Sequence, residues 1–449
     1  MEKMRIGKDA YMGLPDNFGG VNHMIVGAPG SGKTRYLLEP MLLQMNTCSH
    51  LIVDIKGSLY PRLHKSLEDM GYETEIYDFI HMKGSRYNPL EFINSEEDAL
   101  ELAMAIIGRP TNREDPFWKQ NAISLITGMI GYGVYFKHHK SIYLDNEDVL
   151  NRKSFTSVAN RRMLLPVLKS TSNNNTLNLG FLLDMLAEAP VDSENGINPT
   201  FIERFELLNK EFGGNWWPYK RIVSSIGGGM SGRTASSIIV TLMSETYAYR
   251  SDAIKKMMKK NDFHPEELGY KKKAIFIQLK DYDASLHPVA ALMINQAVNR
   301  LVEEAGASRL EVPVQIWMDD CGSYVIPSLT QYMSCCRSRG IGFSLLCQSE
   351  HQLREAYGAS EAETLIQCCH AYFYLGGEDH NSSLRISIRA NVMQSDVLSM
   401  NRSSMYLIQQ GHKARRVAKF NEDEKNAYER NLVAMHTIHK QQSAALINS

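Results

Sequence analysis

Apolar residues near the N-terminus fall into short continuous runs, a pattern typical of strands buried inside a sheet. Such runs occupy residues 21–26, 50–57 and 72–80. After the first run and a glycine-rich turn, apolar residues recur at the spacing of a helix face: Leu37, Leu38, Met41, Leu42 and Met45. Pro40 lies inside this predicted helix and should kink it. The pattern predicts alternating strands and helices over residues 1–93.

At residue 95 the pattern becomes mostly helical and continues so to about residue 262. Ser95 followed by Asp98 is typical of a helix start, and Leu100, Met104 and Ile107 are expected on one face of that helix. The run 121–136 carries no charged residue. It is shorter than the roughly 18–20 residues that a bilayer span needs, so it predicts a buried helix. A polar loop is expected at 169–176.

Strand-like runs return at 272–280, 312–320 and 342–349, and a helix is expected to begin near Pro288. The segment 371–377 and a hairpin at 405–420 complete an α/β sheet. The sequence therefore predicts a discontinuous α/β domain, 1–93 with 263–440. An all-α domain, 94–262, interrupts it, and residues 441–449 form a tail.

Charge is balanced, with 49 basic and 50 acidic residues and a net charge of -1. This excludes a protein that coats duplex DNA through general positive charge. Lysines cluster locally at 255–260 and 271–273. These runs are either solvated surface or, in a ring, a lining that follows a nucleic-acid backbone.

The cysteines indicate a reducing compartment. There are seven, with no C-x-x-C spacing. Cys368, Cys369 and His370 lead into a strand-like segment, so the two cysteines are interpreted as small core residues rather than metal ligands. The chain opens with no signal peptide.

The stretch GAPGSGKT lies between the first predicted strand and helix, the context that turns this motif into a phosphate-binding loop. Backbone N–H groups of the glycine turn would face the β-phosphate, Lys33 would reach the β- and γ-phosphates, and the Thr34 hydroxyl would bind Mg²⁺. The predicted nucleotide-binding residues are Gly27, Ala28, Pro29, Gly30, Ser31, Gly32, Lys33, Thr34 and Arg35.

A second stretch, GGGMSGRT at 227–234, repeats the spacing but has Arg233 where the lysine should be. A guanidinium does not fit the compact position of a lysine ammonium. Pro218, Lys220 and Arg221 also interrupt any preceding strand. The stretch is interpreted as a loop leading into a helix, which leaves one ATP site.

The apolar run at 312–320 ends in two carboxylates, the Walker B arrangement. Asp319 is expected to support Mg²⁺ and Asp320 to orient the attacking water. Aspartate is one methylene shorter than the glutamate usual at the second position. Since a misplacement of about 1 Å can cost about a hundredfold in rate, hydrolysis is expected to be slow, and binding without turnover stays open. Gln348 is predicted to sense the γ-phosphate, or else to cap a solvated strand end. Arg337, rather than Arg339, is the candidate arginine finger acting on a neighbouring subunit.

These residues resemble the type IV secretion coupling proteins, the TraG-like ATPases of conjugation systems. The resemblance extends over nearly the whole chain and is carried by LIVDIKGSLYPRL (51–63), YNPLEFI (87–93), DPFWKQNAISLITGMI (115–130), WMDDCGSYVIPSLTQYMSCCRSRGIGFSLLCQSEHQL (317–353) and MYLIQQGHKARRVAKF (405–420). It implies a RecA-like P-loop ATPase domain with an inserted all-α domain that selects substrate.

Three departures from the family pattern are notable. Members normally begin with transmembrane helices, so this chain is expected to be a soluble fragment or a form recruited to the membrane by a partner. Walker B reads Asp-Asp. Ser58 replaces the usual glutamate and is assigned no role, while Asp54 and Lys56 either support the active site or form a structural turn.

The resemblance implies a cytoplasmic ATPase, peripheral at the inner face of the membrane, that uses ATP and Mg²⁺. It would form a homohexameric ring and move single-stranded DNA or a relaxase–DNA complex into membrane-embedded channel proteins. Two alternatives stay open: a double-stranded DNA translocase of the FtsK or HerA kind, and a nucleotide-binding docking platform that does not hydrolyse ATP.

Overall fold

The computed structural model describes residues 3–13, 20–108, 116–138, 178–189, 197–227, 230–377 and 379–447. They form two compact units. The first, called the sheet unit, is Met1–Ser85 with His264–Ser449; the second, called the helical unit, is Arg86–Phe263. The polar loop expected at 169–176 lies outside the described residues.

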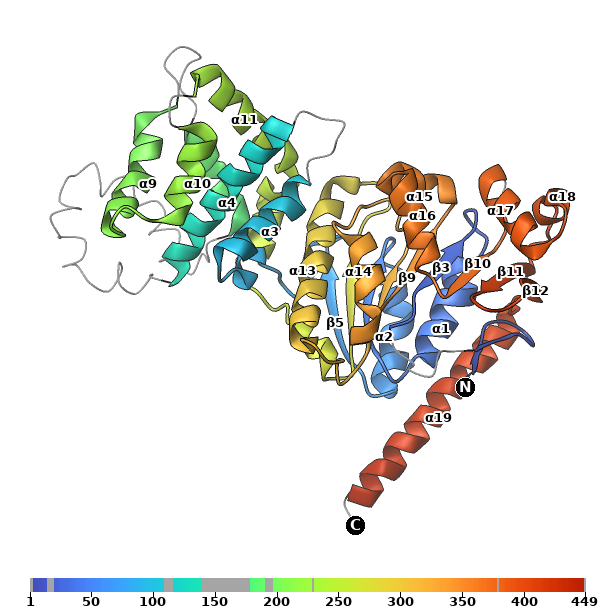
Figure 1. The fold of residues 1–449 in the computed structure, drawn as a ribbon. Coiled ribbons are helices and arrows are strands. Elements are labelled where there is room, and N and C mark those ends of the chain that lie inside the picture. The colour runs from blue at the N-terminus through green and yellow to red at the C-terminus, as the bar shows by residue number, and fades with distance from the viewer. Residues whose placement is uncertain are drawn as a thin grey trace. The chain divides into compact units, whose positions relative to one another are not determined.

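The sheet unit is built on a ten-stranded sheet with the order β12-β11-β10-β3-β9-β8-β4-β7-β5-β6 (Figure 1). The strands are β3 His23–Val26, β4 Ser49–Asp54, β5 Glu73–Asp78, β6 Lys83–Gly84, β7 Lys273–Gln278, β8 Val314–Met318, β9 Ile341–Cys347, β10 Ala371–Tyr374, β11 Ser404–Gln409 and β12 Arg415–Ala418. From β10 to β5 every neighbouring pair is parallel. The carboxyl ends of these strands therefore meet at one edge, where α/β folds bind ligands.

The central strands are apolar because both faces of the sheet are covered by helices. Every residue of β3, β4, β7, β8 and β9 is buried, which explains their continuous apolar runs. The antiparallel strands β6, β11 and β12 lie at the two ends of the sheet order. A separate two-stranded sheet pairs β1 Lys3–Arg5 with β2 Tyr11–Gly13.

Helices cover this sheet on both sides (Figure 1). The helices of the sheet unit are α1 Glu39–Gln44, α2 Leu59–Asp69, α13 His287–Ala305, α14 Leu329–Cys335, α15 Glu350–Tyr357, α16 Ala359–Gln367, α17 His380–Ala390, α18 Gln394–Leu398 and α19 Glu422–Ile447. Helix α13 begins one residue before Pro288, as the sequence predicts. Helix α19 contacts α1 and α2 and continues through residues 441–447, which were expected to form a tail.

The helix after the glycine turn departs from the expected kinked α-helix. Residues Lys33–Leu38 form a π-helical turn, η1, and α-helical geometry begins only at Glu39. Pro40 therefore lies in the first turn of α1, where the missing N–H of a proline costs no hydrogen bond. The departure from regular α-helical geometry is therefore a π-turn before Pro40, a feature frequent at functional sites.

The helical unit contains α3 Glu96–Ile107, α4 Pro116–His138, α8 Leu179–Met185, α9 Pro199–Glu211, α10 Trp217–Ile226, α11 Gly232–Glu245 and α12 Asp252–Met257. Ser95 and Asp98 form the predicted capping box. The buried face of α3 is Ala99, Leu102, Ala103, Ile106 and Ile107, so of the predicted stripe only Ile107 is buried.

Helix α4 is the helix predicted for the charge-free run, and glycines set its packing distance to α10. A Cβ at Gly131 would lie 2.1 Å from the ring of Trp217, and one at Gly128 would lie 2.6 Å from Ile222. Close approach of α10 thus explains why the run contains glycine. Among the described residues, no helix combines the length and apolar character that crossing a bilayer requires.

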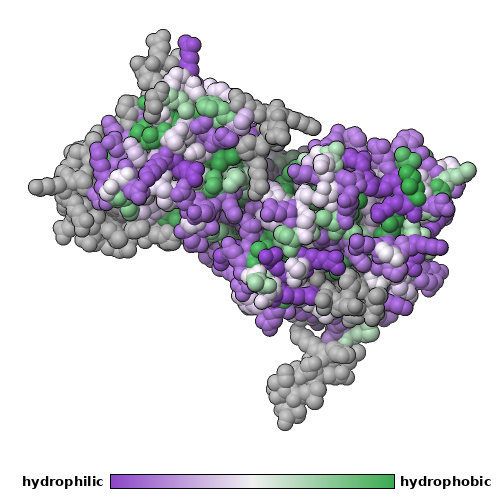
Figure 2. Space-filling view, viewed as in Figure 1, coloured by the Kyte–Doolittle hydropathy of each residue, from purple (hydrophilic) through white to green (hydrophobic). Residues whose placement is uncertain are grey.

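Hydrophobic side chains gather on the surface over α17 and α18 (Figure 2). The exposed apolar residues of these helices and of the turn between them are Leu384, Ile388, Met393 and Leu398. Contiguous apolar surface of this kind marks interaction sites more often than chance.

Candidate nucleotide-binding site

A cavity of about 620 Å³ lies at the carboxyl edge of the sheet. Its lining comes from the segments that follow five parallel strands, β3, β4, β7, β8 and β9. Nine of the predicted site residues line it: Pro29, Gly30, Gly32, Lys33, Thr34, Arg35, Asp319, Asp320 and Gln348. Segments more than 300 residues apart in sequence thus converge because parallel strands end at the same edge.

Two glycines of the turn have left-handed backbone conformations, with φ of 74° at Gly30 and 89° at Gly32. At Gly32 a Cβ would also lie 2.3 Å from the ring of Tyr36. Behind the turn, the Gly27 N–H donates to Cys347 O at 3.2 Å and the Ala28 N–H donates to Gly376 O at 2.9 Å. The turn is therefore anchored to the ends of the strands on both sides of β3.

Lys33 reaches back across its own loop. Its ammonium donates to the carbonyl oxygen of Gly27 at 2.6 Å and is 3.4 Å from that of Ala28. Burial lowers the pKa of Lys33, while the charge of Asp319 acts in the opposite direction. A partly buried ammonium with neutral carbonyl partners favours an incoming anion, because anion binding would compensate the cost of burying its charge.

Thr34 and Asp319 face each other across the cavity. The Thr34 hydroxyl is 3.4 Å from both carboxylate oxygens of Asp319, longer than an ordinary O–H···O hydrogen bond. Burial raises the pKa of Asp319 to about 6, and the charges of Asp54 and Asp320 add to this effect. The carboxylate is thus poorly compensated by the protein alone.

These two residues fit a magnesium ion. Mg²⁺ takes oxygen ligands, and in phosphate sites it is held by one or two carboxylates together with the substrate and water. A divalent cation would relieve the repulsion among Asp54, Asp319 and Asp320, which adds to the effect of burial on the pKa of Asp319. In the part of the chain that the structure describes, no group of three or more His, Cys, Asp or Glu residues is arranged as an all-protein metal site.

Asp54 has a structural role in addition to this electrostatic one. Its carboxylate accepts the backbone N–H groups of Ser58 at 3.0 Å and Leu59 at 2.7 Å. It therefore caps the start of α2 although it lies at the end of β4. The side chain is 1% exposed, and burial raises its pKa.

Asp320 is held by several donors. Its carboxylate accepts from Ser323 Oγ at 2.6 Å, from Gln348 Nε2 at 3.3 Å and from Gln352 Nε2 at 3.2 Å. Its backbone has a φ of 47°, a conformation that Asp and Asn adopt more easily than Glu. Gln348, predicted to sense a phosphate, thus contacts the second carboxylate directly.

Arg337 does not reach the cavity of its own chain. It lies in the short 3₁₀ turn Arg337–Arg339, just before β9, whereas Gln348 follows the other end of that strand. A seven-residue strand separates the two edges by about 20 Å. Any contact of Arg337 with a nucleotide would have to be made on another subunit.

Sequence reasoning missed several residues that line the cavity. Ser58, to which the sequence assigns no role, is one of them. Lys56, for which the sequence leaves an active-site and a structural role open, also lines the cavity. Arg62 and Asp281 also line it. Asp281 lies three residues beyond the end of β7, so its position just past a parallel strand was the one signal available.

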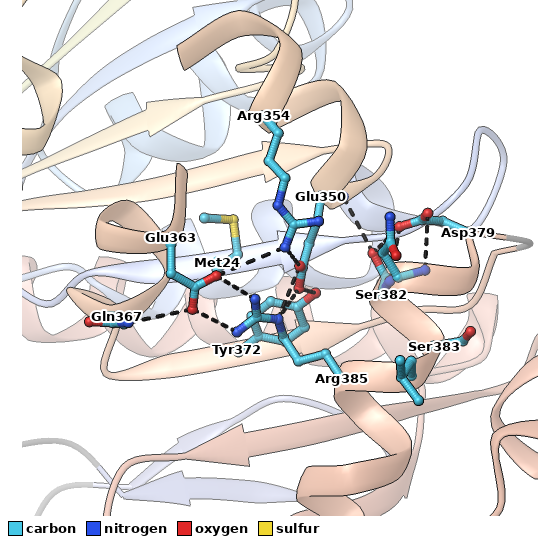
Figure 3. A network of polar contacts seen from close by, with 12 residues as sticks. Met24, Glu350, Arg354, Glu363, Gln367, Tyr372, Asp379, Ser382, Ser383 and Arg385 are labelled. Atoms are coloured by element: carbon cyan, nitrogen blue, oxygen red, sulfur yellow. Dashed lines mark hydrogen bonds and ion pairs between the residues drawn. The ribbon is translucent and has the colours of Figure 1, made fainter. Parts of the chain in front are cut away.

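Gln348 lies between β9 and α15, and the start of α15 is fixed by a buried ionic network (Figure 3). Glu350 is 0% exposed. It accepts from Tyr372 Oη at 2.9 Å and lies 2.9 Å from Arg385 Nε and 3.1 Å from a terminal nitrogen of Arg354. Arg385 also pairs with Glu363 and lowers its pKa. The network joins α15, α16, α17 and β10.

Several lysines of the two lysine-rich runs form ion pairs within the chain. Lys273 is buried and lies 2.7 Å from Glu75 and 2.8 Å from Glu267. Lys271 lies 2.7 Å from Glu267, and Lys260 lies 2.8 Å from Asp262. These lysines act as structural ion-pair partners, so their charge is not all available to a nucleic-acid backbone.

The second glycine-rich stretch has no strand before it. Helix α10 ends at Ile226, and Ser231 caps α11 by accepting the Thr234 N–H at 3.3 Å. Residues 228–229 lie outside the described part. The strand–turn–helix arrangement of a phosphate loop is thus absent from the described residues here.

The comparisons with known proteins agree with this geometry. A family model described as Type IV secretory system Conjugative DNA transfer matches residues 2–390. The chain belongs to this family, and its function is in conjugative DNA transfer by type IV secretion. The resemblance inferred from the motifs is thereby confirmed.

Solved structures show the same fold. The bacterial conjugative coupling protein TrwBdeltaN70 in complex with sulphate is similar, with a TM-score of 0.60, 14% identity and coverage of 90% of this chain and 88% of that chain. TrwB in complex with the ATP analogue ADPNP gives a TM-score of 0.59, 14% identity and coverage of 88% and 84%. TrwB with ADP and Mg²⁺ gives 0.57, at the same identity and coverage. The α/β P-loop ATPase fold is thus confirmed. Among curated proteins, no significant match is found.

Proposed function

We propose that this chain is an ATP-driven coupling protein that moves single-stranded DNA, or a relaxase–DNA complex, into a type IV secretion channel. The observation that carries the proposal is the pairing of Thr34 with Asp319 beside the Lys33 ammonium. These are the groups that a P-loop ATPase needs around Mg²⁺-bound phosphates. Membership of the conjugative DNA transfer family supports a nucleic-acid cargo and disfavours the double-stranded translocase alternative.

In this proposal the glycine turn binds the phosphates through backbone N–H groups, and Lys33 moves from its own loop carbonyls to the β- and γ-phosphates. Thr34 and Asp319 hold Mg²⁺, which when bound neutralises phosphate charge. Asp320 and Gln348 orient the attacking water. The short donor distances around Asp320 favour a fixed orientation of its carboxylate.

We also propose a homohexameric ring that is recruited to the inner face of the membrane by channel partners. In a head-to-tail ring each subunit presents a different face to each neighbour. The remoteness of Arg337 from its own cavity supports a role on the neighbour's nucleotide. The exposed apolar side chains on α17 and α18 support a protein contact.

The test is hydrolysis of Mg²⁺–ATP by the purified chain with and without single-stranded DNA. Turnover that rises with DNA is expected. Lys33→Ala should weaken ATP binding at least about a hundredfold, because the phosphates lose their cationic partner. Unchanged ATP affinity in Lys33→Ala would reject this assignment of the site.

A docking platform that binds ATP without hydrolysis is the second candidate. The three donors to Asp320 favour it, because a carboxylate engaged in this way accepts a water proton poorly. Asp320→Glu separates the two: a gain in turnover indicates a weakened motor. ATP binding without turnover in both forms indicates the platform. The backbone φ of 47° at Asp320 makes a gain in ATP turnover harder to obtain, because glutamate adopts this backbone conformation at a higher conformational energy.

A further inference from the structure

A second lysine contacts the glycine turn from behind. Lys419 lies directly after β12 and is 6% exposed. Its ammonium donates to the carbonyl oxygen of Ser31 at 2.9 Å and is 3.3 Å from that of Leu375, at the end of β10. In the described part of the chain, no carboxylate lies within ion-pair distance of it. A buried cation with neutral partners only is costly, so it calls for a functional explanation.

The contact lies at the peptide unit that joins Ser31 to Gly32. In a trans peptide the C=O and the N–H point in opposite directions. Because the carbonyl of Ser31 accepts from Lys419, the N–H of Gly32 is directed to the other side, and Gly32 lines the cavity. A cationic donor on the carbonyl polarises the peptide and strengthens its N–H as a donor.

The segment after β12 also contacts the helix that follows the loop, at two further points. Glu422 forms an ion pair with Arg35. Lys425 is buried and lies 2.6 Å from Glu39, the first residue of α1. Lys419, Glu422 and Lys425 are three residues apart and contact the loop, the π-turn and α1 in the same order. The terminal segment therefore follows the glycine turn and its helix along their length.

We infer that Lys419 is a positioning residue of the nucleotide site, which fixes the Ser31–Gly32 peptide and strengthens its N–H toward the phosphates. This inference rests on the proposed nucleotide binding. Lys33 would contact the phosphates directly, whereas Lys419 would act on them through the backbone of the loop. Burial lowers the pKa of Lys419 to about 8, in keeping with an ammonium that lacks a compensating charge.

The test compares two buried lysines of the same segment by calorimetric titration with Mg²⁺–ATP. Lys419→Met is expected to weaken binding about tenfold, since one polarised donor is lost. Lys425→Met is the matched control. It removes a buried ammonium that bonds Glu39 rather than the loop, and Arg62 remains 2.8 Å from Glu39. It is expected to leave the affinity within about twofold of wild type. Lys419→Arg, which keeps the charge and donors, should restore most of the loss.

The outcomes separate this inference from the proposed function. No ATP binding by the wild-type chain would reject the proposed function. Wild-type binding that Lys33→Ala abolishes but Lys419→Met leaves unchanged would overturn the inference alone. Equal weakening in Lys419→Met and Lys425→Met would also overturn it, because the effect would then be one of general packing. If Lys419→Met does not fold, Lys419→Gln, which keeps a neutral donor, is measured instead, and wild-type affinity would again overturn the inference.

Discussion

Two carboxylate clusters of the sheet unit differ in how their charge is compensated. At the start of α15, Glu350 is enclosed by Tyr372, Arg354 and Arg385 (Figure 3). At the end of β8, Asp319 has a hydroxyl at 3.4 Å, and burial together with the charges of neighbouring carboxylates raises its pKa to about 6.

In the first cluster, protein groups alone compensate the charge of Glu350, so the charges of this cluster stabilise the fold. The charge of Asp319 lacks such a set of donors within the protein, so it is held at a cost to stability. The difference teaches where function lies in this unit: a buried charge that the protein leaves poorly compensated indicates a ligand, whereas a buried charge with a full set of donors indicates architecture.

The largest effect is expected from Glu350→Gln. Removing this charge leaves Arg354 and Arg385 facing a neutral amide. We expect a loss of about 3 kcal/mol in unfolding free energy, the lower end of the cost of breaking a buried ion pair, because both arginines are partly exposed. Urea unfolding measures it. The matched variant Glu363→Gln, at a more exposed partner of Arg385, should cost about 1 kcal/mol or less. Equal losses in both would contradict the comparison.

Asp319→Asn should have the opposite effect on stability. Neutralising this carboxylate removes its repulsion from Asp54 and Asp320, and the ligand-free chain should gain about 1 kcal/mol. The same variant should lose at least about tenfold in Mg²⁺-dependent nucleotide affinity, because a metal ligand is gone. Thermal unfolding without ligand measures the expected gain in stability, and titration with Mg²⁺–ADP measures the expected loss of affinity. A destabilised Asp319→Asn would show that this charge is structural.

The smallest effect is a dependence on pH. A raised pKa means that Asp319 takes up a proton as the pH falls through about 6. The protonated carboxyl does not bind Mg²⁺, so Mg²⁺-dependent affinity should be about twofold weaker at pH 6 than at pH 8 and fall further below it. Because the folded-state pKa lies above the unfolded value of 3.8, ionisation of this group also lowers the folding stability as pH rises from about 4 to 6. Asp319→Asn controls for protonation of the nucleotide. An identical pH profile in that variant would contradict the assignment.

Local pattern alone determined much of the fold. The buried strands, the capping box of α3 and the start of α13 follow from apolar runs, a Ser–Asp spacing and a proline, because each depends on residues within a few positions of one another. The glycine turn and the Asp-Asp pair could likewise be recognised because their spacing within short segments is characteristic of phosphate and Mg²⁺ chemistry.

Tertiary structure decided what local pattern leaves open. In α3, the predicted and the observed faces share Ile107, and only packing selected the neighbouring face that includes Leu102 over the one that includes Leu100. The donors that fix Asp320 and the remoteness of Arg337 from the cavity depend on which strand ends share an edge of the sheet. Lys419 reaches Ser31 across 388 positions of sequence. Contacts at that separation are set by strand order, which periodicity along the chain does not encode.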